Sequence, residues 1–337
     1  MKLIKNLSLL VILLFIIPQK SYSQVDLKKT AQSTMNFLLV GTSSRAASLG
    51  DAFTVIGKGS ESIFYNPAGL TSMKNEFDIS LNYTGWIADI NYLSGSASWN
   101  SGNLGVFGFH LLVVDYGTIN GTSLLSEDQT NNSLGYIDNG VVSNVSAYSL
   151  GLSYAKSISN AFSLGGTIKL TGQNLGENLY TSGVQKNNAS KIAFDAGVKY
   201  QTQFNDFVFG MSIRNFATNI KREEIEEQLP LLFSLGAAIN VMKVISPEIA
   251  PENSIILATD FLHQNNYSER VNIGIEYTYM NMVSLRGGYQ TNRDLASWSG
   301  GIGLHTSLSG YDVSVSYSYS SFEVFNSVNR LSVSFSF

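Results

Sequence analysis

Few residues in this sequence could catalyse a reaction or bind a metal ion. The three histidines, His110, His263 and His305, lie far apart and lack the close spacing of a metal site. The absence of cysteine excludes a disulfide framework, a thiolate metal site and a thiol nucleophile. The stretch from Gly41 to Gly50 lacks the Gly-Lys-Ser/Thr ending of a phosphate-binding loop. We expect no catalytic residue, no metal site and no cofactor, although the abundant serines leave a Ser–His hydrolase open as an alternative.

Charged side chains instead occur singly, between apolar residues. They are Lys169, Asp195, Lys199, Arg214, Asp260, Glu276 and Arg286. If the flanking apolar residues face lipid, these side chains point to the opposite face, into the lumen of a barrel, where they can pair. On the lipid face each cation would cost about 2–4 kcal/mol at mid-depth. We expect a structural network that holds a plug in the lumen; a role in transport or gating is the alternative.

The segments that carry these residues alternate between apolar and polar side chains. The last seven residues, Leu331–Phe337, place Leu, Val and Phe on one face and serine on the other, and Tyr311–Tyr319 repeats the pattern. Few soluble proteins do this, whereas outer-membrane barrels do it strand after strand, and a terminal Phe337 is typical of chains assembled by the outer-membrane insertion machinery. The pattern predicts an all-β fold, a transmembrane antiparallel β-barrel of about fourteen strands. Besides the two terminal segments, the strands are Phe77–Tyr83, Ile87–Trp99, Phe107–Val113, Tyr148–Tyr154, Phe162–Leu170, Ile192–Tyr200, Phe207–Ile213, Phe233–Val241, Ile255–Phe261, Val271–Tyr279, Val283–Tyr289 and Ile302–Leu308.

The connections between the predicted strands differ in length in a regular way. Long polar stretches follow odd-numbered strands, at Tyr116–Ser143, Asn174–Ser190, Ala217–Pro230 and around His263–Glu269. Tight turns follow even-numbered strands, at Asn205-Asp206, Met280-Asn281 and Ser309-Gly310. Barrels that enter the outer membrane from the periplasm show this asymmetry, because their external loops are long and their periplasmic turns are short.

The N-terminus has the pattern of an export signal. Lys2 and Lys5 precede the apolar run Leu7–Ile17, and small residues stand at Ser21 and Ser23. We therefore predict a signal peptide at residues 1–23, cleaved before Gln24, an N-terminal plug or periplasmic segment at 24–75 and an outer-membrane barrel at 76–337. The net charge of −4 argues against nucleic acid as a partner, because its phosphates bind basic surfaces.

Three local motifs stand outside the alternation. A short helix is predicted near Arg45–Phe53, and the charged stretch Lys221–Glu227 is interpreted as a solvated helix in an external loop. Asn66-Pro67-Ala68-Gly69 predicts a rigid turn into the barrel, in which Pro67 fixes φ and Gly69 permits left-handed geometry.

The segment before the barrel resembles the PorV/PorQ family of Bacteroidetes outer-membrane proteins, which are distantly similar to the FadL fatty-acid transporters. The resemblance rests on Phe37-Leu-Leu-Val-Gly41, Arg45-Ala-Ala-Ser-Leu-Gly-Asp-Ala-Phe53 and Ser62-Ile-Phe-Tyr-Asn-Pro-Ala-Gly-Leu70. The motif positions singled out are Arg45, Gly50, Phe53, Asn66, Pro67 and Gly69.

This resemblance implies a FadL-like barrel that works without catalysis in type IX protein secretion. Its expected partners are outer-membrane lipid and either secretion-system proteins or the C-terminal signal domains of cargo. The alternative is a FadL-like channel for hydrophobic small molecules. An apolar cluster inside the lumen would favour transport, whereas a plugged, charged lumen with ordered apolar loops would favour protein binding.

Overall fold

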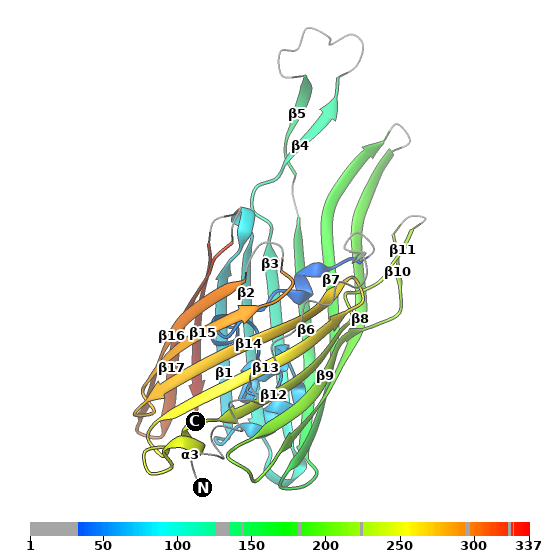
Figure 1. The fold of residues 1–337 in the computed structure, drawn as a ribbon. Coiled ribbons are helices and arrows are strands. Elements are labelled where there is room, and N and C mark those ends of the chain that lie inside the picture. Colours follow the sequence, from blue (N-terminus) through cyan, green and yellow to red (C-terminus); the bar gives the residue numbers. More distant parts are fainter. Residues whose placement is uncertain are drawn as a thin grey trace, which may run out of the picture.

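The structure is a computed structural model that describes residues 33–125, 135–142, 145–180, 183–222, 225–293, 297–322, 325 and 327–337. The predicted signal peptide and its cleavage site before Gln24 lie outside these residues. The described chain forms a barrel of strands around an interior segment, with long hairpins projecting at one end (Figure 1).

The barrel is closed and contains the fourteen antiparallel strands that the alternation predicts. In chain order they are β1 (Phe77–Gly85), β2 (Asn91–Asn100), β3 (Val106–Asp115), β6 (Ser146–Ser157), β7 (Phe162–Tyr180), β8 (Gly183–Gln201), β9 (Val208–Phe216), β12 (Leu232–Asn240), β13 (Ser254–Gln264), β14 (Tyr267–Tyr279), β15 (Val283–Gln290), β16 (Trp298–Leu308), β17 (Tyr311–Ser320) and β18 (Val328–Ser336). Strand β1 pairs with β18 and closes the barrel. Beyond that pairing, Phe77 and Phe337 exchange backbone hydrogen bonds of 2.8 and 2.9 Å, and their rings stack with centroids 5.4 Å apart.

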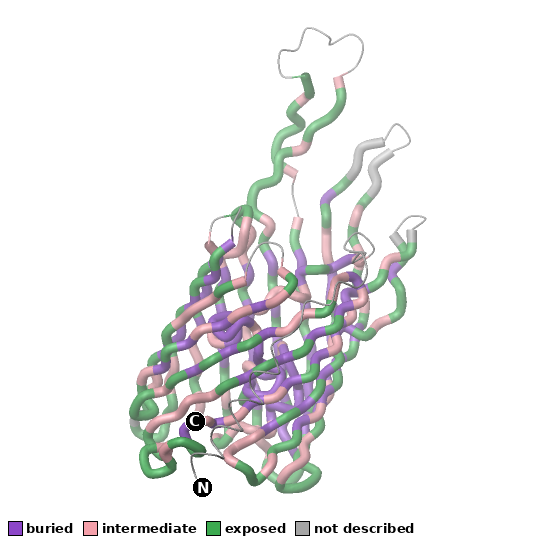
Figure 2. The backbone as a smooth tube through the Cα atoms, viewed as in Figure 1, coloured by how far each residue is buried: buried purple, intermediate pink, exposed green. Residues whose placement is uncertain are grey.

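The side chains of each strand divide between an outer apolar face and an inner polar face. In β1, Ile79, Leu81 and Tyr83 are exposed on the outside, whereas Ser80 and Asn82 are buried inside. The same alternation of exposed and buried residues follows the strands around the barrel (Figure 2). An apolar outer face is what a barrel surrounded by lipid requires.

The two ends of the barrel differ. The long-hairpin end carries three projecting hairpins: β4 (Asn120–Leu124) with β5 (Tyr136–Val141), the extensions of β7 and β8, and β10 (Ile220–Arg222) with β11 (Ile225–Glu227) (Figure 1). The opposite turn end carries two-residue turns in which both residues have positive φ, at Asn205-Asp206, Met280-Asn281 and Ser309-Gly310. Such turns suit hairpins because their twist matches that of the strands.

Three expectations about the connections were wrong. The helix predicted at 221–227 is replaced by the pairing of β10 with β11, in which Lys221 lies opposite Glu226. A short helix is marginal, whereas paired strands gain opposite-charge contacts. The connection near His263–Glu269 is not long, since only Asn265 and Asn266 separate β13 from β14. At the turn end, the connection 241–253 is longer than expected and contains α3 (Met242–Ile245).

The plug, defined as residues 33–73, lies inside the barrel. It consists of η2 (Asn36–Leu39), α2 (Ser44–Ser48), η3 (Gly59–Phe64) and η4 (Pro67–Ser72), and short turns η5 (Ile87–Asp89) and η6 (Gly102–Leu104) follow outside it. Helix α2 begins at its cap Ser43, whose side chain accepts a hydrogen bond from the backbone of Ala46. It ends before the predicted Phe53, because Gly50 and Asp51 have positive φ. In the part of the chain that the structure describes, no helix is long and apolar enough to span a membrane.

The Asn66–Gly69 turn is present but works differently from the prediction. Asn66 caps η4 by accepting a hydrogen bond from the backbone of Ala68, and Pro67 stands at the first helical position. The left-handed geometry predicted for Gly69 is wrong, since Gly69 does not have positive φ. Glycine is needed there for space: a Cβ atom would lie 2.6 Å from the Ser62 side chain and 2.8 Å from the Gly57 carbonyl oxygen.

Candidate ligand-binding site

The charged residues predicted to face the lumen all come from the barrel wall, and most of them hold the plug. Glu276 binds two arginines: Arg45 of the plug, at 2.7 and 2.9 Å, and Arg286 of the wall, at 2.5 Å. Asp260 accepts hydrogen bonds of 2.8 Å from the backbone of both Phe53 and Thr54, and a further one of 2.7 Å from the Thr54 hydroxyl. Side chains of β13 and β14 therefore hold the plug against the wall by hydrogen bonds and an ion pair.

The other charged residues predicted to face the lumen make separate contacts, so the seven residues do not form one connected network. Lys199 donates to Ser72 at 2.8 Å, and Arg214 donates to the backbone carbonyl of Phe64. The buried pair Lys169–Asp195, at 2.7 Å, lies within the wall. Lys169 also donates to the Asn215 side chain, and Asp195 accepts from the Asn215 backbone, each at 2.7 Å. Four of the seven residues thus hold the plug at separate points, whereas Lys169, Asp195 and Arg286 bind other residues of the wall.

Several wall residues that bind the plug were not identified from the sequence. Gln290 donates to the Gly50 carbonyl at 2.8 Å and to Asp51 at 2.9 Å. Arg330 donates to the Gly41 carbonyl at 2.9 Å, and Ser332 accepts from the backbone of Ser44 at 2.8 Å. All three stand at inward positions of the alternation, which is the signal that could have identified them.

The histidines lie in three different environments. His110 is buried against the Phe64 ring, and His263 pairs with Glu269 at 3.1 Å near the long-hairpin end. His305 contacts the Ser284 hydroxyl at 3.1 Å, but the same nitrogen lies 3.4 Å from the Arg286 guanidinium. A cation there disfavours the imidazolium that general-base catalysis would form. Within the described residues, no group of three or more His, Asp or Glu side chains could hold a metal ion.

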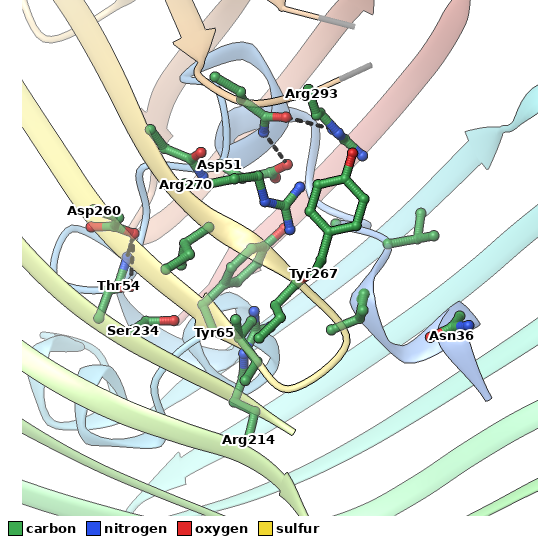
Figure 3. Close-up of a pocket in the computed structure, with 18 of the residues that line it drawn as sticks. Asn36, Asp51, Thr54, Tyr65, Arg214, Ser234, Asp260, Tyr267, Arg270 and Arg293 are labelled. Carbon is green, nitrogen blue, oxygen red and sulfur yellow. Dashed lines mark hydrogen bonds between the residues drawn. The ribbon is translucent and has the colours of Figure 1, made fainter. Parts of the chain in front are cut away.

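A cavity of about 350 Å³ lies at the long-hairpin end, between the plug and the wall. We call it the outer cavity. Much of its surface is apolar, and its apolar and aromatic lining includes Leu39, Val40, Trp86, Ile87, Leu262 and Phe322. Tyr65 of the plug and Tyr267, the first residue of β14, both line this space (Figure 3). The size and lining suit a small organic molecule.

The outer cavity also carries an excess of positive charge. Arg214, Arg270 and Arg293 line it, and each guanidinium lies over an aromatic ring, at 5.6, 5.5 and 5.9 Å from the ring centroid. Among the described residues, none of the three makes an ion pair within 4 Å, and the buried Nε of Arg270 has no hydrogen-bond partner. Of the two lining acids, Asp260 is engaged by the plug backbone and Asp51 by Gln290. The cavity therefore combines apolar walls with three guanidinium groups that make no close ion pair among the described residues.

An apolar cluster adjoins the outer cavity inside the lumen. Met35 and Phe37 of the plug pack there with Tyr92, Leu112 and Val114 of the wall and with Ile220 and Leu229 of the connection between β9 and β12. Val40 and Trp86 belong both to the edge of this cluster and to the lining of the outer cavity. The lumen is thus plugged and charged in part, but it also contains a buried apolar region that is continuous with the cavity.

Comparison with known proteins identifies the fold. No protein-family model matches the chain, and no curated protein matches its sequence. Solved structures do match. The CymD monoaromatic hydrocarbon channel has a TM-score of 0.56 and 13% identity, covering 89% of this chain and 98% of that one. The toluene transporter TodX of Pseudomonas putida has a TM-score of 0.57 and 12% identity, with coverage of 86% and 96%. A FadL homologue of Pseudomonas aeruginosa has a TM-score of 0.52 and 11% identity, with coverage of 88% and 97%.

The fold is that of a FadL-type outer-membrane barrel. The FadL-like part of the expectation from sequence is therefore confirmed, together with the antiparallel barrel of fourteen strands. The finer assignment to the PorV/PorQ family gains no support, because no family model matches and these three structural matches are a channel, a transporter and a FadL homologue.

Proposed function

We propose that this protein is an outer-membrane channel for hydrophobic small molecules, and that it favours those with an acidic group. The outer cavity is the observation that carries this proposal. Its apolar lining can bind a hydrocarbon, and Arg214, Arg270 and Arg293 can bind a carboxylate at its edge. The similarity to hydrocarbon channels supports the proposal at the level of fold only.

The position of the cavity supports entry of the ligand from outside the cell. Long hairpins are extracellular in outer-membrane barrels and short turns are periplasmic, so the outer cavity would open towards the outside of the cell. A ligand entering there meets the apolar cluster around Met35 and Phe37 next. In this proposal the cluster is the hydrophobic part of the path, and the plug separates it from the periplasm.

The secretion role remains the second candidate function. In its favour stand the resemblance of residues 45–70 and the three projecting hairpins, which could contact a cargo domain or an attachment partner. The apolar cluster in the lumen, however, is the feature expected of a transporter. Transport is therefore the better supported function, and measurements of uptake and of secretion distinguish the two.

A binding experiment tests the role of the outer cavity. Protein in lipid nanodiscs should bind decanoate more tightly than decanol, because only the acid can pair with a guanidinium. Arg270→Gln should weaken decanoate binding about tenfold or more, as expected for loss of a charged hydrogen bond of about 1.5–3 kcal/mol, and should leave decanol binding unchanged. Isothermal titration calorimetry measures both.

The matched control is Lys156→Gln, which removes an exposed cation from β6, away from the cavity. Equal affinity for decanoate and decanol, or equal effects of the two substitutions, would contradict the assigned role of Arg270. If neither ligand binds the unmodified protein, the outer cavity is not the entry site.

A further inference from the structure

A second cavity of about 350 Å³ lies at the opposite, turn end of the lumen. Its lining includes Asp78 of β1, Asn281 of the β14–β15 turn and Ser314 of β17. It shares Asn281, His305, Ser314 and Ser334 with a wider cavity of about 670 Å³ at the same end. Because the two cavities share these walls, they form one inner vestibule that would open towards the periplasm.

Hydroxyl groups dominate the lining of the inner vestibule. Serines from β1, β13, β15, β17 and β18 contribute to it, among them Ser80, Ser254, Ser284, Ser314 and Ser334. A hydroxyl is uncharged and can donate a hydrogen bond to an oxyanion. A wall of serines can therefore solvate an anion without being selective for one particular anion. The lining differs in this respect from the aromatic outer cavity.

The acidic side chains of the inner vestibule are already engaged. Glu276 is held by Arg45 and Arg286, and Glu61 accepts a hydrogen bond from the Ser43 hydroxyl. Asp78 accepts from the Ser60 backbone at 2.7 Å and from the Ser336 hydroxyl at 2.5 Å. Asp312, which lines the wider cavity, accepts from the Asn75 side chain at 3.1 Å. None of these carboxylates is paired with the remaining cation, Lys58.

Lys58 is the charged group without a partner. It lines the vestibule and its side chain is exposed although it lies within the barrel, so its exposed surface faces the cavity. Within the described residues it makes no ion pair and no hydrogen bond through its ammonium group. The surrounding barrel reduces the solvation of the Lys58 ammonium group and so lowers its pKa, and the nearby positive charge of Arg45 lowers it further. An anion bound here would relieve that repulsion.

We propose that the inner vestibule binds a small oxyanion, a carboxylate or a phosphate, with Lys58 as its charged contact and the surrounding serines as neutral donors. The ammonium group supplies a compact charge with three donors, which suits an anion of variable geometry better than a planar guanidinium would. The vestibule faces the periplasm, and the ligand would come from there. This inference is independent of what enters the outer cavity.

The experiment uses the full mature chain in nanodiscs and isothermal titration with inorganic phosphate and with acetate. We expect the unmodified protein to bind at least one of these anions, and Lys58→Met to weaken that binding tenfold or more. Lys58→Arg should retain most of the binding, because it keeps the charge. Lys156→Met, at an exposed site on β6, should leave it unchanged.

The inference is overturned if neither anion binds the unmodified protein, or if Lys58→Met binds as tightly. A protein that binds decanoate through Lys58 but neither phosphate nor acetate would also overturn it, because the site would then hold the head group of a transported molecule. Each variant is first shown to be folded by the heat-dependent shift of its band in SDS gels. Lys58→Arg keeps the test decisive if Lys58→Met fails to assemble.

Discussion

Replacement of Gly288 by valine should prevent the plug from seating and should block assembly of the barrel. Gly288 stands at an inward position of β15, where the wall meets the plug backbone directly. A Cβ atom at Gly288 would lie 2.0 Å from the backbone nitrogen of Gly50 and 2.2 Å from the carbonyl carbon of Leu49. Overpacking between side chains costs about 1–3 kcal/mol, and here the cost should be higher because the plug backbone cannot rotate away.

Gly287 provides a matched control one residue earlier on the same strand. Its side-chain position points outwards, and a Cβ atom there would meet only a methyl carbon of Ile275, at 3.8 Å. Valine is favoured in strands and on a lipid-facing surface, so Gly287→Val should assemble normally. The measurement is the fraction of each variant that shows the heat-dependent band shift of a folded barrel. Equal assembly of the two variants would mean that the plug does not pack on β15 as described.

The same close approach recurs around the wall and explains why so many strands contain an inward glycine. A Cβ atom would come within 3 Å of a plug atom at Gly108, Gly165, Gly197, Gly236, Gly274 and Gly301. These glycines come from different strands, so the plug is surrounded by backbone on most sides. The plug and barrel must therefore form one packed unit.

Replacement of Phe53 by alanine should turn the closed barrel into a conducting pore. Phe53 is fully buried between the two cavities. Its ring packs edge-on against Tyr65, which lines the outer cavity, at 4.9 Å, and lies 5.4 Å from the guanidinium of Arg45, which lines the inner vestibule. Removing the ring should connect the two spaces. Since Asp260 binds the backbone of residue 53, this anchor should survive the substitution.

Conductance in planar lipid bilayers measures this effect. The unmodified protein should show little steady current, whereas Phe53→Ala should show persistent open channels. Loss of a buried phenyl ring costs about 3–5 kcal/mol of stability, so folding is checked in parallel. Phe322→Ala is the control, because Phe322 lines the outer cavity at the long-hairpin end and does not lie between the cavities. A folded Phe53→Ala protein that conducts no better than this control would show that the barrier lies elsewhere.

The sequence predicted the barrel well because a transmembrane strand carries its own signal. Each residue of a strand faces either lipid or lumen, so period-two alternation reveals both the strand and the orientation of its side chains, as at Leu331–Phe337. The two-residue turns at the turn end were also predictable, since Asn, Asp and Gly favour positive φ. The prediction of a helix at 221–227 was wrong, because a short charged segment has similar intrinsic propensities for a helix and for a hairpin.

The site was less predictable, because it depends on which inward residues meet which atoms of the plug. Alternation places Asp260 and Glu276 in the lumen, but only the strand register brings one to the Phe53 backbone and the other to Arg45. The outer cavity was missed because Arg270 and Arg293 lie near the ends of strands, where alternation stops. The aromatic partners of the three arginines come from the plug (Tyr65), the start of β14 (Tyr267) and the segment after β17 (Phe322), and no local sequence pattern links them.

Deletion of the gene, with two parallel measurements, tests the central claim most directly. The first is uptake of a radiolabelled hydrophobic acid such as decanoate by intact cells, and the second is the set of proteins found in the culture medium. We predict that uptake falls severalfold, that secretion is unchanged, and that the intact gene restores uptake while the Arg270→Gln gene restores it poorly. Normal uptake together with loss of secreted proteins would contradict this account and would favour the secretion role.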